Sequence, residues 1–484
     1  MSESKKVWPI KSETSCYLKW SWSTIYIQRA TTASCHRTTH IDFDLDEFDN
    51  FHNLEKKVDD RRRMLAGGWP AESELDYVAS GCTYCKYLED RGGVSDRQVQ
   101  MRNLPLAFQN HENVLPPELI ANPEAVEVTP TIVEVYFNNI CNMGCLYCGP
   151  HFSSIWEEEN RRFNVTKDTG ILVNPTWRKD EDRYHAMVDK LFAWLREHGH
   201  KIWNFGMLGG EPFFQKEFDM VLDHWDNYPN PDLLLTVVTN LKVEHERFKS
   251  YIDRFKQMID AGKIKSVNIS CSLDCWGPQI EYVRYGLSLE QWQQNFEYML
   301  DKDWIVLNIN AAITPLTIKT LPEFVEKINE WDQIRLLNTV AKNLKVPYDK
   351  ISGYRERIMK MIADNKIPQA DIDKHITFSF MHVLEPMHMN PLWFGPGVFT
   401  EDMQRVLDCM PETTDYQRNY KNYMSGIARS IETNQRDPAM ILKLEKYLTE
   451  MDRRRHTRWQ DLFPWLEDEF ARARQELAEK YNHQ

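Results

Sequence analysis

The sequence predicts an α/β fold whose central part is a parallel β-sheet covered by helices. Short runs rich in β-branched and aromatic residues, which favour strands, recur along the middle of the chain. Segments with helical periodicity separate these runs, and such alternation is typical of parallel sheets with right-handed crossovers. The length of 484 residues exceeds what one hydrophobic core supports, so we expect two or three domains.

Six strands and the helices between them can be predicted in order along the middle of the chain. The strands are expected at 131–139, 202–208, 233–239, 266–273, 304–313 and 376–384. The helices are expected at 216–225, 246–261, 288–300 and 321–331. After residue 396 the chain is helical and rich in charge, and the apolar stripe of 439–451 is typical of an amphipathic helix.

Net charge, the lack of long apolar runs and the number of cysteines limit the classes of protein to which this chain can be expected to belong. The formal net charge of −13 argues against a nucleic-acid surface as the main partner, because such surfaces track phosphates with basic side chains. The arginine runs at 61–63 and 453–455 are expected to be solvated helix faces. No apolar leader and no run of 18 apolar residues is present, which predicts a cytoplasmic protein without membrane contact. In a reducing compartment ten cysteines indicate metal binding or reactivity rather than disulfides.

Three cysteines lie within eight residues, directly after the first predicted strand. Cys141, Cys145 and Cys148 have C-x3-C-x2-C spacing in a loop that leads into a helix. Soft thiolates select zinc, copper(I) or iron–sulfur clusters, and a site with only three protein ligands keeps one position open for chemistry. The alternatives are a zinc knuckle or cysteines that simply pack in the core.

A second motif follows the second predicted strand: Gly209, Gly210, Glu211 and Pro212. Glycine tolerates unusual φ angles and close approach of the backbone to another group. With the cysteine triplet upstream, this turn resembles the radical S-adenosylmethionine (SAM) superfamily. The resemblance implies a partial (β/α)6 TIM-like barrel over 126–396, a [4Fe-4S] cluster on the three cysteines and contact of the glycine turn with the methionyl end of SAM. In such barrels the active site lies at the carboxyl ends of the strands.

The resemblance also implies roles for five residues at other strand ends. Tyr147 matches the aromatic position beside the adenine. Asn240 is suited to ribose or methionyl contacts, and Ser272 with Asp274 looks like the Ser-x-Asp signature near the ribose. Arg284 matches an arginine that pairs with the SAM carboxylate, where a rigid bidentate fork is favoured. For each residue the alternative is a strand-end cap or a surface hydrogen bond.

Four more cysteines lie upstream of the barrel: Cys16, Cys35, Cys82 and Cys85. The segment 17–27 alternates like one arm of a β-hairpin, and the last two cysteines have C-x2-C spacing. Residues 1–125 thereby resemble a small α+β Twitch or SPASM module that holds an auxiliary [4Fe-4S] cluster. A four-thiolate zinc ribbon is the alternative. Residues 397–484 are expected to form a helical flank or lid.

The resemblance implies an enzyme of oxidoreductase or transferase type that reductively cleaves SAM to a 5′-deoxyadenosyl radical. The radical would take a hydrogen from a peptide or amino-acid-derived substrate, with electrons from a donor such as flavodoxin or ferredoxin. Cys275, at the rim, is a candidate for returning a hydrogen atom to the substrate radical. The competing hypotheses are an enzyme that modifies tRNA or another nucleic acid, and a non-catalytic iron–sulfur scaffold or sensor.

Overall fold

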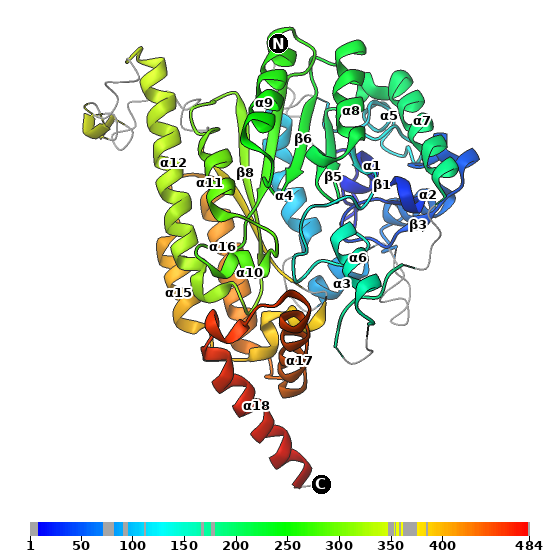
Figure 1. Ribbon diagram of the computed structural model, residues 1–484. Coiled ribbons are helices and arrows are strands. Elements are labelled where there is room, and N and C mark those ends of the chain that lie inside the picture. The colour runs from blue at the N-terminus through cyan, green and yellow to red at the C-terminus, as the bar shows by residue number, and fades with distance from the viewer. Residues whose placement is uncertain are drawn as a thin grey trace. The chain divides into compact units, whose positions relative to one another are not determined.

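The computed structural model describes residues 8–70, 82–90, 95–110, 113–165, 169–175, 180–346, 353, 355–357, 360–361, 375–383 and 386–482 (Figure 1). The chain divides into two compact units. Unit 1 comprises 1–138, 176–237 and 252–267, and unit 2 comprises 139–175, 238–251 and 268–484.

Unit 1 is built on a sheet in which the first predicted strand, 131–139, has a neighbouring strand on each side. Its strand order is β3 (Ile41–Asp42), β2 (Thr31–Ala33), β1 (Trp22–Tyr26), β4 (Ile132–Tyr136), β5 (Asn204–Leu208) and β6 (Leu234–Thr239). The strands β1, β4, β5 and β6 run parallel, with Glu134 opposite Thr24 on one side and Gly206 on the other. The predicted strands at 131–139, 202–208 and 233–239 are thus confirmed.

The segment 17–27 differs in part from the expected hairpin arm. Residues Leu18–Ser21 form the short helix α1, and only the rest is the strand β1. This strand does form an antiparallel hairpin with β2, as expected, but its other edge pairs in parallel with β4. The alternating pattern could not reveal this second pairing, because it comes from residues more than a hundred positions away.

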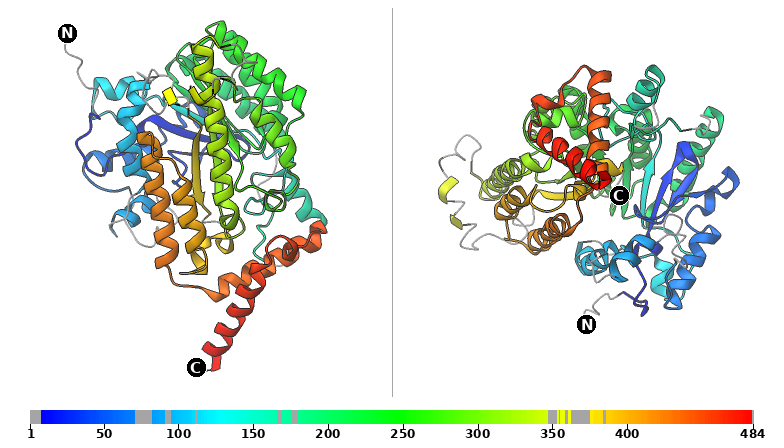
Figure 2. Two further views of the ribbon diagram at one scale, coloured as in Figure 1. Left: turned by 90° about the vertical axis from the view of Figure 1, so that its left-hand side faces the viewer. Right: turned by 90° about the horizontal axis from the view of Figure 1, so that it is seen from below.

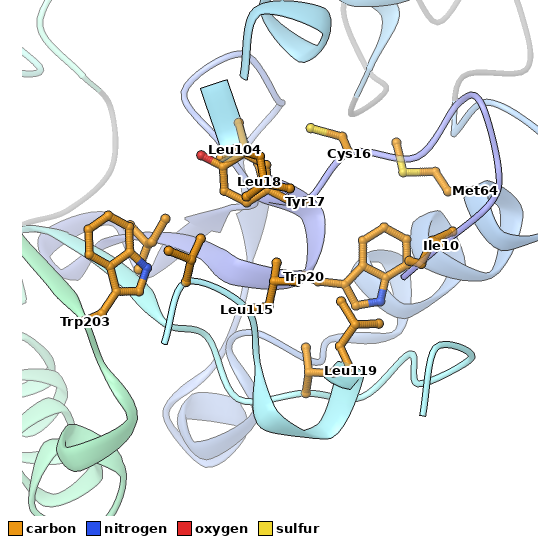
Figure 3. Packing of buried hydrophobic residues seen from close by; sticks show 13 residues of the cluster. Ile10, Cys16, Tyr17, Leu18, Trp20, Met64, Leu104, Leu115, Leu119 and Trp203 are labelled. Carbon is orange, nitrogen blue, oxygen red and sulfur yellow. The ribbon is translucent and has the colours of Figure 1, made fainter. Parts of the chain in front are cut away.

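The helices of unit 1 surround this sheet. They are α2 (Glu55–Leu65), α3 (Thr83–Asp90), α4 (Asp96–Asn110), α5 (Pro117–Ala121), α7 (Glu181–His198) and α8 (Lys216–Asn227). No helix was predicted at α7, although Asp180 caps its first turn by accepting a hydrogen bond from the Arg183 amide. A buried apolar cluster that includes Cys16, Tyr17, Trp20 and Trp203 joins α1 to α5 and β5 (Figure 3).

Unit 2 contains the remaining strands and the C-terminal helices. The strand order is β7 (Ser266–Ser272), β8 (Ile305–Ile313) and β9 (Thr377–His382), with β8 and β9 parallel. Its helices are α6 (Ser154–Arg162), α10 (Gln279–Val283), α11 (Leu289–Glu297), α12 (Leu321–Asn343), α15 (Thr400–Cys409), α16 (Asp415–Thr433), α17 (Pro438–Arg455) and α18 (Trp465–Asn482). Helix α9 (His245–Asp260) begins in unit 2 and ends in unit 1.

Helices α12, α15 and α16 lie side by side, and α17 packs against α18 (Figure 2). All six predicted strands and the four predicted helices are present, so the α/β class and the helical C-terminal region are confirmed. Parallel strands that follow chain order, as here within each unit, are what a partial (β/α)6 barrel requires. Among the described helices, none is long and apolar enough to cross a membrane.

Candidate functional site

The cysteine triplet lies on a loop that backbone hydrogen bonds hold in place. Cys141, Cys145 and Cys148 are half-buried and stand between β4 and α6. The amide of Gly144 donates to the carbonyl of Tyr285 at 2.9 Å, and the amide of Leu146 donates to that of Val283 at 2.8 Å. Because two of the loop amides are bonded to the segment around α10, the loop is anchored independently of any ligand. We call residues 139–153 the cysteine loop.

Side chains from α6 and α17 support the same loop. The indole of Trp156 donates to the carbonyl of Cys145 at 2.8 Å, and the hydroxyl of Tyr447 donates to the carbonyl of Leu146. Ser153 caps α6 and also donates to the carbonyl of Met143 at 2.7 Å. The contact with α17 was missed from the sequence, where this helix showed only an amphipathic pattern.

The arginine run at 453–455 is not the solvated helix face that was expected. Arg454 and Arg455 are buried, and both pair with Glu159 of α6. The guanidinium of Arg455 lies between the rings of Trp156 and Tyr285, 4.7 and 4.6 Å from their centroids. These cations can be buried because aromatic rings and a carboxylate compensate their charge.

Two donors of Arg455 remain open beside the cysteine loop. Its Nη1 and Nη2 atoms are buried without a hydrogen-bond partner among the described residues. A Cβ placed on Gly144 would lie 3.0 Å from Nη2, so the guanidinium touches the loop where only glycine leaves room. Burial raises the pKa of Cys145, while Arg284 and Arg455 act to lower it. Buried donors without acceptors beside thiols fit an anionic group such as a thiolate-bound cluster.

Asp274 and Arg284, two predicted SAM contacts, pair with each other. Arg284 Nη2 and Nε donate to the two carboxylate oxygens of Asp274 at 2.8 and 2.9 Å. Tyr147 donates its hydroxyl to Asp274 at 2.7 Å, and the amide of Ala312 donates to Asp274 at 2.9 Å. Arg284 Nη1 is directed elsewhere and lies 4.0 Å from the sulfur of Cys145. The structure therefore brings three of the predicted residues together beside the cysteine loop.

The other predicted residues of unit 2 differ in their surroundings. Asn240 donates to Asn142 at 2.9 Å and lies 3.9 Å from the sulfur of Cys141. Ser272 ends β7 and is half-buried. Cys275 is completely buried, and burial raises the pKa of its thiol to about 12. Among the three, only Asn240 contacts the cysteine loop.

The glycine turn of unit 1 requires its glycines for two separate reasons. Gly209 and Gly210 have φ angles of 80° and 55°, in the left-handed region that side chains disfavour. A Cβ on Gly209 would also lie 2.3 Å from the ring of Tyr136. Glu211 is completely buried and accepts a hydrogen bond from the Phe213 amide, which fixes the exit of the turn. The carbonyl of Gly209 accepts a hydrogen bond from the Gln215 side-chain amide at 2.7 Å, so the turn is fixed where β5 ends.

The four N-terminal cysteines line one pocket of unit 1. Cys16 precedes α1, Cys35 follows β2, Cys82 precedes α3 and Cys85 lies within α3. Burial raises the pKa of all four thiols, and that of Cys16 reaches about 12. We call this the four-cysteine pocket.

The thiols of the pocket interact with one another, because Cys35 and Cys85 each contribute to the raised pKa of Cys16. Nevertheless, within the described ranges no group of three or more His, Cys, Asp or Glu side chains is arranged to hold a single metal ion. Thiolates on one tetrahedral zinc would lie about 3.8 Å apart, given a Zn–S distance near 2.3 Å. Thiolates that bind separate irons of a cube lie farther apart, and the donor set of four convergent thiols fits such a cluster.

Comparisons with known proteins agree with the motifs. Residues 135–328 match the family model described as the radical SAM superfamily. No curated protein sequence matches the chain.

Three solved structures are similar at low identity. SuiB of Streptococcus suis bound to precursor peptide SuiA is 12% identical, with 75% of this chain and 72% of that chain covered and a TM-score of 0.30. SuiB bound to S-adenosylmethionine is 13% identical, with coverages of 74% and 71% and a TM-score of 0.30. TYW1 with a lysine-pyruvate adduct is 15% identical, with coverages of 40% and 58% and a TM-score of 0.22. At these TM-scores the similarities carry no argument about this chain.

Proposed function

On the premise of the match of residues 135–328 to the radical SAM superfamily, we propose that the protein is an enzyme that reductively cleaves SAM and abstracts hydrogen from a peptide or amino-acid-derived substrate. One observation carries the proposal. The loop that carries the three thiols contacts, at Gly144, the guanidinium of Arg455, whose Nη1 and Nη2 are buried and have no hydrogen-bond partner among the described residues. A loop that only packed in the core would not need open donors beside its thiols.

The cysteine loop would hold the cluster through Cys141, Cys145 and Cys148. When bound, the cluster and SAM supply the 5′-deoxyadenosyl radical. The chain itself fixes the loop through the amides of Gly144 and Leu146. Trp156 and Tyr447 hold the loop backbone by donating to the carbonyls of Cys145 and Leu146.

The SAM contacts are proposed for the residues that the family resemblance indicated. Both oxygens of Asp274 already accept hydrogen bonds, so its role is to orient Arg284 and Tyr147. Arg284 Nη1 is proposed for the SAM carboxylate and the ring of Tyr147 for the adenine. Asn240 and Ser272 are proposed for the ribose or methionyl groups, and the backbone of Gly209–Pro212 for the methionyl end.

The four-cysteine pocket is proposed to hold an auxiliary [4Fe-4S] cluster in a Twitch- or SPASM-like module. The support is that one pocket gathers four thiols from three separate segments. Such a cluster would assist electron transfer or substrate binding. We further propose a cytoplasmic enzyme that receives electrons from a protein such as flavodoxin or ferredoxin.

The test is anaerobic reduction of the reconstituted protein in the presence of SAM, with detection of 5′-deoxyadenosine. Wild type should form it, and the triple variant C141A/C145A/C148A should form none. The control is C409A, because this thiol lies on α15 beside Glu326 and has no place in the proposed site. Formation of 5′-deoxyadenosine by the triple variant at the wild-type rate would contradict the proposal.

A further inference from the structure

Basic side chains gather on the Lys19 side of the four-cysteine pocket. The cations that line the pocket are Lys19, Arg37 and Arg97. Arg37 pairs with Asp96, which also lines the pocket, and Arg97 pairs with Glu89 at 2.6 Å, so these two charges are compensated. Lys19 is the most deeply placed, since only 3% of its side chain is exposed. Its ammonium contacts Asp60, which does not line the pocket, at 2.6 Å. The positive end of this ion pair therefore lies on the pocket side.

Two further cations are buried behind Lys19. Lys57 is completely buried and donates to the hydroxyls of Ser23 and Thr32 at 2.9 and 2.7 Å, both of which are neutral. Arg61, expected from the sequence to be solvated, is also completely buried and donates to the carbonyl of Lys19 at 2.8 Å. Burial lowers the pKa of Lys57 well below its usual range, and Arg61 and Lys19 add to this effect.

Buried charge of one sign is costly unless an opposite charge compensates it. Asp60 is paired with Lys19, whereas Lys57 donates to hydroxyls and Arg61 donates to a carbonyl, so one bonded carboxylate faces a group of three basic side chains. A cluster held by four thiolates is an anion, and a reduced cluster is more negative by one electron. The charge distribution of the pocket thus matches such an anion, and it favours the reduced form most.

We propose that Lys19 is a positioning residue that raises the reduction potential of the auxiliary cluster, so that the cluster accepts an electron readily. This inference rests on the proposed occupant of the four-cysteine pocket. One electron passes to the cluster from the proposed flavodoxin- or ferredoxin-type protein, which is thereby oxidised, and no bond or proton changes place. Four thiolates would ligate all four irons of the cluster and leave none open for substrate. Of the two proposed uses, electron transfer and substrate binding, this ligand set therefore favours electron transfer.

The experiment uses the full chain with C141A/C145A/C148A, so that only the N-terminal cluster is observed. Iron per chain is measured first, and the reduced cluster is then followed by electron paramagnetic resonance during a potential titration. K19M should lower the ratio of reduced to oxidised cluster at the original midpoint about tenfold, which is 59 mV for one electron. D60N, which removes the opposing negative charge, should shift the ratio the other way, and K19R should stay close to the parent.

The matched control is K56M, because Lys56 is the exposed neighbour of Lys57 on α2. It should leave the ratio unchanged. Full iron with unchanged midpoints in K19M and D60N, or shifts of the same sign in both, would overturn the role of Lys19. If K19M fails to bind iron, D60N alone tests the proposal. A shift of its ratio towards the reduced cluster supports the role of Lys19, and any other result overturns it. A parent chain that binds no iron overturns the proposed auxiliary cluster itself, and the iron count reveals this before any potential is measured.

Discussion

The cysteine loop and the four-cysteine pocket both gather thiols near buried cations, but the two regions differ in how these cations are paired with carboxylates. Beside the loop, each buried arginine has a carboxylate partner: Arg284 pairs with Asp274, and Arg455 pairs with Glu159 through Nε while its Nη1 and Nη2 stay open. On the Lys19 side of the pocket, Asp60 pairs with Lys19, and the nearby Lys57 donates to the neutral hydroxyls of Ser23 and Thr32. Matched charges hold a loop in one geometry, whereas an excess of one sign indicates a place for a ligand of the other sign.

The two regions also differ in how the chain builds them. The cysteine loop is one short segment after a strand, so its thiols are near one another in the sequence and need no distant segment to bring them together. The pocket depends on tertiary structure, because β1 and β2 must pair before Cys16 and Cys35 can meet α3. We therefore expect damage to the N-terminal fold to empty the pocket, while the loop depends on a few supporting side chains.

The largest effect is expected from breaking the matched charges beside the loop. D274N should lower the free energy of unfolding by about 3–5 kcal/mol, because it leaves Arg284 buried without a charged partner. Urea unfolding of the apoprotein measures this. The control D301N alters an exposed carboxylate and should change stability by less than about 0.5 kcal/mol. A loss below about 1 kcal/mol in D274N would show that the pair does not stabilise this region.

A second prediction concerns an unmatched carboxylate in unit 1. Among the described residues, Glu134 accepts hydrogen bonds from Trp22 and Thr24, and burial raises its pKa to about 7. A carboxyl whose pKa is raised by folding adds stability that is complete at low pH and is lost as pH rises towards the folded value.

The variant E134Q has no carboxyl at this position and so loses this pH dependence. The free energy of unfolding of E134Q minus that of wild type should therefore rise by about 2 kcal/mol between about pH 5 and about pH 8. Urea unfolding at the two pH values gives the comparison. A difference that stays constant with pH would mean that Glu134 has an ordinary pKa.

The smallest effect is expected from removing the arginine behind the loop. R455M takes away the guanidinium between Trp156 and Tyr285, and iron on the cysteine loop should be lost to a chelator about tenfold faster. The four-cysteine pocket should lose its iron at the original rate. R453M is the matched control, because the side chain of Arg453 is 56% exposed. Equal iron loss in both variants would refute the supporting role of Arg455.

Local patterns predicted much of this molecule and failed where distant segments meet. The six strands were predicted from runs of β-branched and aromatic residues. The glycine turn was predicted from the tolerance of glycine for unusual φ angles, and Gly209 and Gly210 do have positive φ. The pairing of Asp274 with Arg284 was missed, because each residue was considered only as a contact for SAM. The burial of Arg61 and Arg455 was also missed, since charge runs usually face solvent and their acceptors come from elements far along the chain.

The central claim is that two separate sets of thiols hold two iron–sulfur clusters. The most direct measurement is iron, zinc and electron paramagnetic resonance on the anaerobically reconstituted wild type and two cysteine variants. Wild type should bind about eight irons, and C141A/C145A/C148A and C16A/C35A/C82A/C85A should each retain about four with distinct spectra. A variant that keeps the full iron load, or zinc in place of half the iron of wild type, would contradict the account.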